Sequence, residues 1–362
     1  MKKSLVALAA LAATSAFAQF SIDGNMDVGY ANINYKGTAV SGIINNGANT
    51  SQINFRGTEN LGGGLKASFR VETDWNTVSN AGNQGSPAAA ATPVASSFGN
   101  GEIRAGIAGG FGAIDAGAVN NAQLTAFLTG QPFGTAIGSS FRGQFVNDTS
   151  AANGVRFDNS VRYTTPSFNG FSGTVLNVNK NTKATDTQTF STTFGNFDYA
   201  GVSEYSVNYN QGPINATYAS TKQDYAGVAG GAALSTQLKT IGGNYTMGAL
   251  TLYALNQKRT KSDNSVDRTM TTVSAKYTMG ANSIMAQMGS GKDAGTSGNG
   301  QTTRLASLGY NYDLSKMSNI YVRYENINDA GVTTGNWISG LTGVTMTEAK
   351  RTRTAIGYKV GF

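Results

Sequence analysis

The strongest constraint on the fold of this chain is an alternation of apolar and polar residues with a period of two. Near the beginning, Ile22 and Val28 fall on one parity, and Asp23 and Asp27 fall on the other. Residues 65–72 repeat the pattern, and so do many later segments. Successive side chains of a β-strand point to opposite faces, so this period predicts strands rather than helices. We therefore expect an all-β fold.

The connections between the expected strands alternate between short and long. Short ones such as 60–64 and 247–248 are separated by longer polar ones such as 33–50 and 119–154. This division predicts sixteen strands, at 20–32, 51–59, 65–75, 101–108, 113–118, 155–165, 171–180, 202–210, 213–222, 237–246, 249–259, 268–278, 282–291, 302–312, 319–328 and 351–362. An even number of strands, with short turns at one end and long loops at the other, is typical of outer-membrane β-barrels. Side chains cannot fill so wide a barrel, so we expect a water-filled lumen lined by the polar parity.

The composition restricts the chemistry. The 362 residues include no Cys and no His, and 13% are charged, about half of the ~25% usual in soluble domains. The lack of Cys and His excludes Cys/His zinc sites, Ser-His-Asp triads and thiolate catalysis. Glycine clusters at 62–64 and 109–110 fall in expected hairpins and precede no helix, which argues against a phosphate-binding loop. We expect no enzyme, no metal and no cofactor, and the dispersed basic residues predict no nucleic-acid binding.

The first eighteen residues have the pattern of an export signal. Lys2 and Lys3 precede the apolar stretch 5–13, and Ala16 and Ala18 match the small-x-small cleavage rule. This stretch is shorter than the roughly 20 apolar residues that a transmembrane helix needs. We therefore expect a cleaved signal peptide, 1–18, and one barrel domain, 19–362.

Three stretches resemble the general porins of Gram-negative bacteria, especially the betaproteobacterial type. They are FRGTENLGGGLKA at 55–67, RFDNSVRYTTP with the following FNGF at 156–171, and GYKVGF at 357–362. The resemblance covers the whole mature chain. It implies a 16-stranded antiparallel transmembrane β-barrel in the bacterial outer membrane, assembled as a homotrimer, with the third loop folded into the lumen.

The resemblance also implies a function and partners. The protein would form a channel for passive diffusion of small hydrophilic solutes and ions. Its neighbours would be outer-membrane lipids and lipopolysaccharide, and the barrel-assembly machinery would recognise the C-terminal strand through Tyr358, Val360 and Phe362. A substrate-specific channel and an adhesin that uses the long surface loops remain as alternatives.

The longest expected loop, 119–154, is the candidate for the third loop. Between Val119 and Asn147 it contains no Asp or Glu, and it contains Arg142. Its apolar residues favour packing against a wall over an ordinary surface loop. It includes a turn similar to the Pro-x-Phe-Gly turn of related constriction loops, formed by Gln131, Pro132, Phe133 and Gly134.

Strand parity points several basic side chains into the expected lumen. Arg56, Arg104 and Arg162 lie at similar heights near mid-barrel and are our first candidates for the arginine ladder that anion-selective relatives place opposite the third loop. Further candidates for the pore constriction are Arg70, Lys66 and Arg142. A basic ring favours anions, so we expect small anionic or neutral solutes. Inward carboxylates would offset part of this charge, namely Asp23, Asp27 and Glu72.

Overall fold

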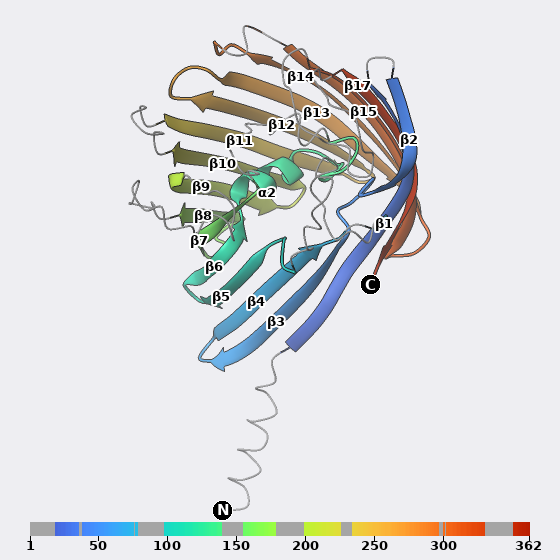
Figure 1. Cartoon of the computed structure of the whole chain (residues 1–362). Coiled ribbons are helices and arrows are strands. Elements are labelled where there is room, and N and C mark those ends of the chain that lie inside the picture. The colour runs from blue at the N-terminus through green and yellow to red at the C-terminus, as the bar shows by residue number, and fades with distance from the viewer. Residues whose placement is uncertain are drawn as a thin grey trace, which may run out of the picture.

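The computed structural model is an antiparallel β-barrel, in which the strands follow one another around the ring (Figure 1). The structure describes residues 19–35, 38–75, 77–78, 98–139, 155–178, 199–225, 234–296, 300, 302–329 and 350–362. The expected signal peptide, 1–18, lies outside these residues. Within them, no helix has the length and apolar character needed to cross a membrane.

Each strand pairs with its neighbour in antiparallel register. The strands are β1 (Gln19–Tyr35), β2 (Thr38–Asn45), β3 (Gln52–Gly62), β4 (Leu65–Asp74), β5 (Ile103–Gly109), β6 (Gly112–Asn120), β7 (Arg156–Thr164), β8 (Phe171–Val178), β9 (Tyr199–Gln211), β10 (Ile214–Tyr225), β11 (Leu234–Met247), β12 (Leu250–Lys261), β13 (Asp267–Met279), β14 (Asn282–Asp293), β15 (Thr302–Asp313), β16 (Ser318–Asp329) and β17 (Arg351–Gly361). Strand β17 pairs with β1 from Asn25↔Gly361 to Tyr35↔Arg351 and so closes the ring.

The ring has sixteen positions, although the described residues form seventeen strand segments. Strands β2 and β3 both pair with the same edge of β1: Val28↔Asn45 begins the pairing with β2, and Asn25↔Gln52 ends the pairing with β3. They are two halves of one strand, interrupted by residues 46–51. Each of the sixteen expected strands overlaps an observed one, so the predicted strand number is confirmed.

The prediction of a long loop at 33–50 is wrong. Strand β1 continues to Tyr35, and β2 occupies Thr38–Asn45. The outward positions of this hairpin lose their large apolar side chains beyond Tyr30 and Ile43: the next pair is polar, with Asn32 Nδ2 donating to Ser41 Oγ at 2.6 Å, and both residues are exposed. The apolar-outward pattern used to find the strands therefore stops before the strands do.

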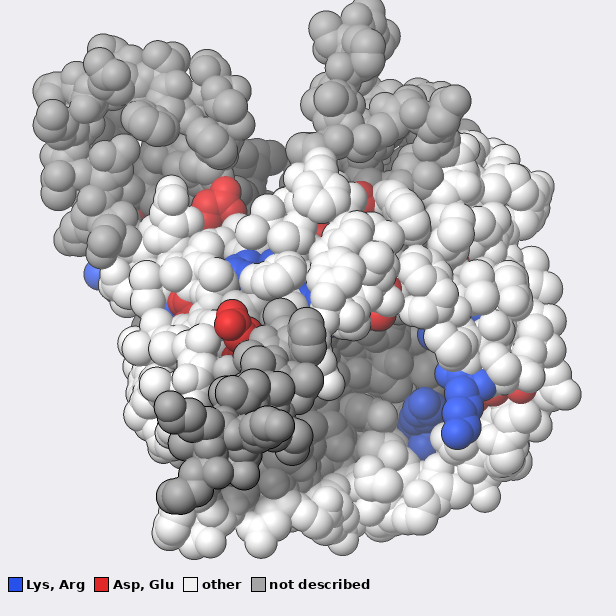
Figure 2. All heavy atoms as spheres, turned by 90° about the horizontal axis from the view of Figure 1, so that it is seen from below, with Lys and Arg blue, Asp and Glu red and all other residues white. Residues whose placement is uncertain are grey.

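The two faces of the barrel differ in polarity. Large apolar side chains are exposed on the outer face, among them Ile241, Val273 and Met288. The inner face carries buried polar side chains such as Glu204 and Gln287. Uncharged residues cover most of the described surface in Figure 2, and charged side chains form a few small patches. An apolar exterior around a polar interior is the arrangement of a barrel that spans a membrane.

The longest connection, between β6 and β7, begins with a short helix. Helix α2 (Ala122–Thr129) starts at Asn121, whose side chain accepts a hydrogen bond from Leu124 N at 3.0 Å. A side-chain oxygen at this position satisfies one of the unpaired N–H groups of the first turn. The structure describes this connection as far as Ser139, and Arg142 lies outside the described residues.

Candidate functional site

Three of the predicted arginines lie side by side on the barrel wall. Arg56 on β3 is the cross-strand partner of Arg70 on β4, and Arg70 is the partner of Arg104 on β5. The fourth, Arg162, lies on β7. Adjacent strands in register place these four guanidinium groups within one narrow band of the wall, and we call the four residues the arginine row.

Carboxylates pair with the first two arginines of this row. Arg56 Nε lies 2.6 Å from Asp23 Oδ2. Arg70 forms ion pairs with Glu72 and with Glu102, the latter at 2.8 Å between Nη1 and Oε2. The sequence predicted that Asp23 and Glu72 would offset part of the basic charge, and both carboxylates are in contact with the predicted arginines.

Asp115 joins the other two arginines. Its Oδ1 accepts from Arg104 Nη1 at 2.5 Å, and its Oδ2 accepts from Arg162 Nη2 at 2.7 Å. Asp115 is the cross-strand partner of Arg162 on one side and of Gly106 on the other. A side chain at Gly106 would collide with the Asp115 carboxylate, so this glycine leaves the space that the shared ion pair occupies.

The arginines of this wall are closer to solvent than most of their partners. The side chains of Glu72, Glu102 and Asp115 are 8%, 5% and 8% exposed. Those of Arg70, Arg104 and Arg162 are 16%, 24% and 22% exposed. Arg56 and Asp23 are similarly exposed, at 40% and 43%. Three of the four carboxylates are therefore less accessible than the arginines with which they pair, so the accessible charge of this part of the wall is mainly cationic.

Two other predicted residues lie elsewhere. Lys66 follows the turn between β3 and β4 and is exposed at that end of the barrel, away from the arginine row. Asp27 has no part in the row. Its carboxylate accepts from Tyr321 Oη at 2.5 Å and from the backbone N–H groups of residues 47–49. Asp27 thereby holds residues 46–51, which separate β2 from β3.

The described part of the β6–β7 connection, residues 121–139, contacts strands on the other side of the ring. Ala122 N donates to Glu204 Oε1 of β9 at 2.6 Å. Gln123 Nε2 donates to Thr221 Oγ1 of β10 at 2.8 Å and to the backbone of β11. At Gly242 of β11, a side chain would collide with the backbone oxygen of Ala126, so the glycine allows the helix to lie directly on the strand.

The turn predicted at Gln131, Pro132, Phe133 and Gly134 is formed and tightly bonded. Gln131 Oε1 accepts from Phe133 N at 2.7 Å, and its Nε2 donates to Gly134 O at 2.7 Å. The Phe133 ring is buried against β15, where a Cβ at Gly309 would lie 2.8 Å from Phe133 Cε1. This segment packs against the wall, as its apolar content predicted.

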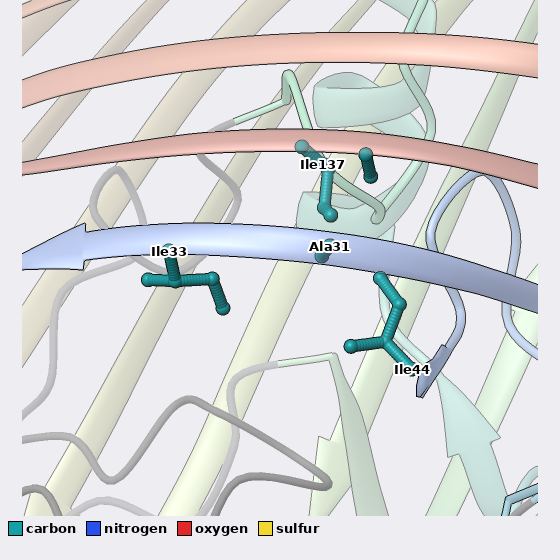
Figure 3. Close-up of a cluster of buried hydrophobic side chains, with 5 residues drawn as sticks. Ala31, Ile33, Ile44 and Ile137 are labelled. Atoms are coloured by element: carbon teal, nitrogen blue, oxygen red, sulfur yellow. The ribbon is translucent and has the colours of Figure 1, made fainter. Parts of the chain in front are cut away.

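The end of the segment reaches the first and last strands. Ile137 lies in a buried apolar cluster with Ala31, Ile33, Ile44 and Ala355 (Figure 3). Gly138 N donates to Glu325 Oε2 of β16 at 3.0 Å. Glu325 in turn pairs with Arg353 of β17 at 2.6 Å. Residues 121–139 thus contact β9, β10, β11, β14, β15 and β16, and Ile137 shares a buried cluster with residues of β1, β2 and β17. The arginine row lies on β3 to β7.

Sequence reasoning did not single out several residues that organise this site. Glu102, Glu204 and Glu325 fall on the polar parity of their strands, and this signal was available in the sequence. Gly106 and Gly242 gave no local signal, because their role depends on which side chain or helix lies across from them. Among the described residues, no group of three or more acidic side chains could hold a metal ion.

The C-terminal residues complete the closure. Tyr358 and Val360 pair with Val28 and Met26 of β1. Phe362 N donates to Gly24 O at 3.1 Å, and Gly24 N donates to Phe362 O at 3.1 Å. The last strand is thus bonded to the first up to the final residue of the sequence.

A closed barrel with an apolar exterior and a charged inner wall defines the class of outer-membrane channel proteins. The family model for the Gram-negative porin matches residues 4–331, and the chain belongs to this family. Outer membrane porin protein 32 of Delftia acidovorans is 31% identical over 335 residues, which cover 89% of this chain and 88% of the relative. An outer membrane porin protein of Bordetella pertussis is 30% identical over 235 residues, or 59% of this chain and 58% of the relative.

Solved structures agree on the fold. The anion-selective porin from Comamonas acidovorans matches with a TM-score of 0.76 and 24% identity, covering 96% of this chain and 100% of that one. The trimer form of OmpT of Vibrio cholerae matches with a TM-score of 0.67 and 12% identity, covering 95% and 99%. The protein is an outer-membrane porin, a channel rather than an enzyme, and the resemblance seen in the sequence is confirmed.

Proposed function

We propose that this porin is a channel for passive diffusion of small hydrophilic solutes and ions, with a preference for anions. The observation that carries the proposal is the arrangement of the arginine row, in which the side chains of Arg70, Arg104 and Arg162 are more exposed than those of the carboxylates with which they pair. Arginine remains charged at all physiological pH values and binds carboxylate or phosphate as a fork. A cationic lining favours anions.

We further propose that residues 121–139 fold into the lumen and form the second side of the constriction. Their hydrogen bonds to Glu204, Thr221 and Glu325, all on the polar parity of the wall, support this placement. Because 121–139 contains no Asp or Glu, it would add no negative charge opposite the arginines. The Comamonas structure, described as an anion-selective porin, is in keeping with this choice of ion.

The assembly and surroundings are also part of the proposal. We infer a cleaved signal at 1–18, a homotrimer, contact with lipopolysaccharide, and recognition of the C-terminal strand by the barrel-assembly machinery. The OmpT neighbour is described in a trimer form, which supports the trimer. The outward side chains of Tyr358 and Val360 and the terminal Phe362 remain accessible at the end of the barrel, as a recognition signal requires.

Planar-bilayer recordings of the purified protein test this function. We expect stepwise, ohmic conductance in KCl, and a reversal potential in a salt gradient that reports anion preference. The Arg56→Ser/Arg162→Ser variant should move this potential toward cations, because it removes two guanidinium groups. It leaves the Asp23 carboxylate and the Oδ2 atom of Asp115 without their arginine partners. Lys316→Ser, in the turn between β15 and β16, is the control and should move it little.

Two results would contradict the proposal. A silent bilayer from correctly folded protein would exclude a diffusion channel. An unchanged reversal potential in the Arg56→Ser/Arg162→Ser variant, with normal conductance, would show that another part of the lumen sets the ion preference.

A further inference from the structure

A short segment between β2 and β3 leaves the barrel wall on its inner face. Strand β2 ends its pairing with β1 at Asn45, and β3 resumes that pairing at Gln52. Residues 46–51 stand opposite only two residues of β1, so they cannot continue the ladder and bend away from it. They bend inward, because three of their backbone N–H groups donate to the carboxylate of Asp27, on the inward parity of β1. We call residues 46–51 the inner bulge.

Tyr321 of β16 reaches Asp27 from across the closure of the barrel. Its Oη donates to Asp27 Oδ1 at 2.5 Å, and the same Oδ1 accepts from Gly47 N at 3.2 Å. The tyrosine side chain lies across β17 and β1 over two cross-strand partners, Gly357 and Gly29. A Cβ at Gly29 would lie 2.7 Å from Tyr321 Oη, and a Cβ at Gly357 would collide with the hydroxyl and the ring. The two glycines therefore form a groove that aims the hydroxyl at Asp27.

The inner bulge is also bonded to residues 121–139. Gly47 O accepts from Ile137 N at 3.3 Å, and Thr50 Oγ1 lies 3.2 Å from Thr135 Oγ1. Gly47 thus receives Ile137 through its carbonyl and is held by the wall through its N–H group. A continuous series of hydrogen bonds joins the barrel closure to residues 121–139, formed by Tyr321, Asp27, Gly47 and Ile137.

We propose that the hydrogen bond between Tyr321 and Asp27 is a positioning contact of the channel. It holds the inner bulge against the wall and, through the bulge, holds residues 135–137 at a fixed place in the lumen. Both side chains are fully buried, so they act through the bulge and not on the permeating ion. The inference rests on the proposed function, in which residues 121–139 form one side of the constriction.

Single-channel recordings of Tyr321→Phe test the proposal, since this substitution keeps the ring in its groove and removes the hydroxyl. Loss of a hydrogen bond to a charged group lowers the ratio of held to displaced bulge at least about tenfold. We therefore expect the time spent outside the main conductance level to rise by about the same factor. The control is Tyr310→Phe, which removes a hydroxyl bonded to Asn282 Oδ1 at 2.6 Å on the exposed face, and it should behave like the wild type.

A second variant acts on the bulge without touching the barrel closure. Thr50→Val removes one hydroxyl of the contact with Thr135. A neutral hydrogen bond contributes less than a charged one, so we expect about a fivefold rise in the time outside the main level. This variant keeps the proposal testable if Tyr321→Phe folds poorly.

A disulfide between the bulge and residues 121–139 provides a rescue. The chain contains no Cys, so Thr50→Cys/Thr135→Cys introduces a single possible disulfide, at a place where the two side-chain oxygens are 3.2 Å apart. In the Tyr321→Phe background, we expect the oxidised protein to return to the main conductance level of the wild type. Reduction with dithiothreitol should bring the fluctuations back, a redox dependence that a merely structural role of Tyr321 would not produce.

Three outcomes would overturn the proposal. One is a Tyr321→Phe channel with a lower unfolding midpoint but wild-type occupancy of the main level, because the hydroxyl would then serve stability alone. Another is fluctuation that persists when the disulfide is closed, because the effect would then not pass through the inner bulge. A silent wild type would contradict the proposed channel function and this role with it, whereas a conducting wild type with unchanged variants contradicts the positioning role alone.

Discussion

At the scale of single residues, the inner wall is a set of arginines whose charge is largely matched by carboxylates. Asp115 is shared by Arg104 and Arg162, and the absence of a side chain at Gly106 provides its space. With charges so nearly matched, ion preference depends on which group is closer to the permeating ion. Because the side chains of Arg104 and Arg162 are more exposed than that of Asp115, removal of the Asp115 charge should strengthen the preference for anions.

Asp115→Asn tests this balance, because it removes one negative charge while keeping the shape of the side chain. We expect the reversal potential to move further toward anions, the opposite direction to the Arg56→Ser/Arg162→Ser variant. The folded barrel should lose about 1–3 kcal/mol, since two charge-assisted hydrogen bonds become weaker. Asp313→Asn, at the end of β15 away from the row, is the control. A shift toward cations would mean that Asp115 does not act on ions through its charge.

At the scale of elements, the position of helix α2 depends on glycine in the strand beneath it. A side chain at Gly242 would meet the backbone of α2, whereas at the neighbouring Gly243 the nearest atom, Asn215 O, would be 3.5 Å away, an ordinary contact. The two glycines are adjacent in β11 and point to opposite faces, so they form a matched pair.

Gly242→Ala should displace the helix and change the single-channel conductance, and Gly243→Ala should not. Overpacking of this kind costs about 1–3 kcal/mol, so Gly242→Ala should also lower the midpoint of thermal unfolding. Equal conductance in the two variants and the wild type would show that the position of α2 does not limit the flow of ions.

The period-two pattern predicted the strands well and the site only in part. It found sixteen strands because lipid on one side and polar contents on the other impose the same alternation on each of them. It missed β2, whose outward positions Ala39, Ser41 and Ile43 include a single large apolar residue, and it could not predict an eight-residue helix inside a long connection. Parity also found Arg56, Arg70 and Arg104, but their pairing with Glu102 and Asp115 depends on the register between strands, which no local pattern contains.

At the scale of the whole molecule, the fold depends on the joining of its first and last strands. Strands β1 and β17 are more than 300 residues apart in the sequence and pair over eleven positions. In a membrane, an open sheet edge would leave backbone groups without partners, and each costs several kcal/mol. Closure is therefore required for the barrel, and the two hydrogen bonds between Gly24 and Phe362 are its last contacts at this end.

Deletion of Phe362 tests whether this residue acts in closure itself. The deletion removes both hydrogen bonds and the ring that covers Gly24, where a Cβ would lie 2.7 Å from Phe362 Cζ. We expect the truncated chain to fold in detergent with a lower unfolding midpoint, reduced by about 1–3 kcal/mol of stability. Phe168→Ala, which removes an exposed ring from the β7–β8 turn, is the control and should unfold like the wild type.

Expression of the truncated chain in cells separates a role of Phe362 in barrel closure from a role in recognition by the assembly machinery. Closure is a property of the chain, so its loss should appear equally in detergent and in the outer membrane. A truncated chain that is as stable as the wild type in detergent, but fails to reach the outer membrane, would contradict a role in closure. It would leave Phe362 with the role that the sequence predicted, as part of the signal recognised by the assembly machinery, because only that role requires a partner absent from the detergent experiment.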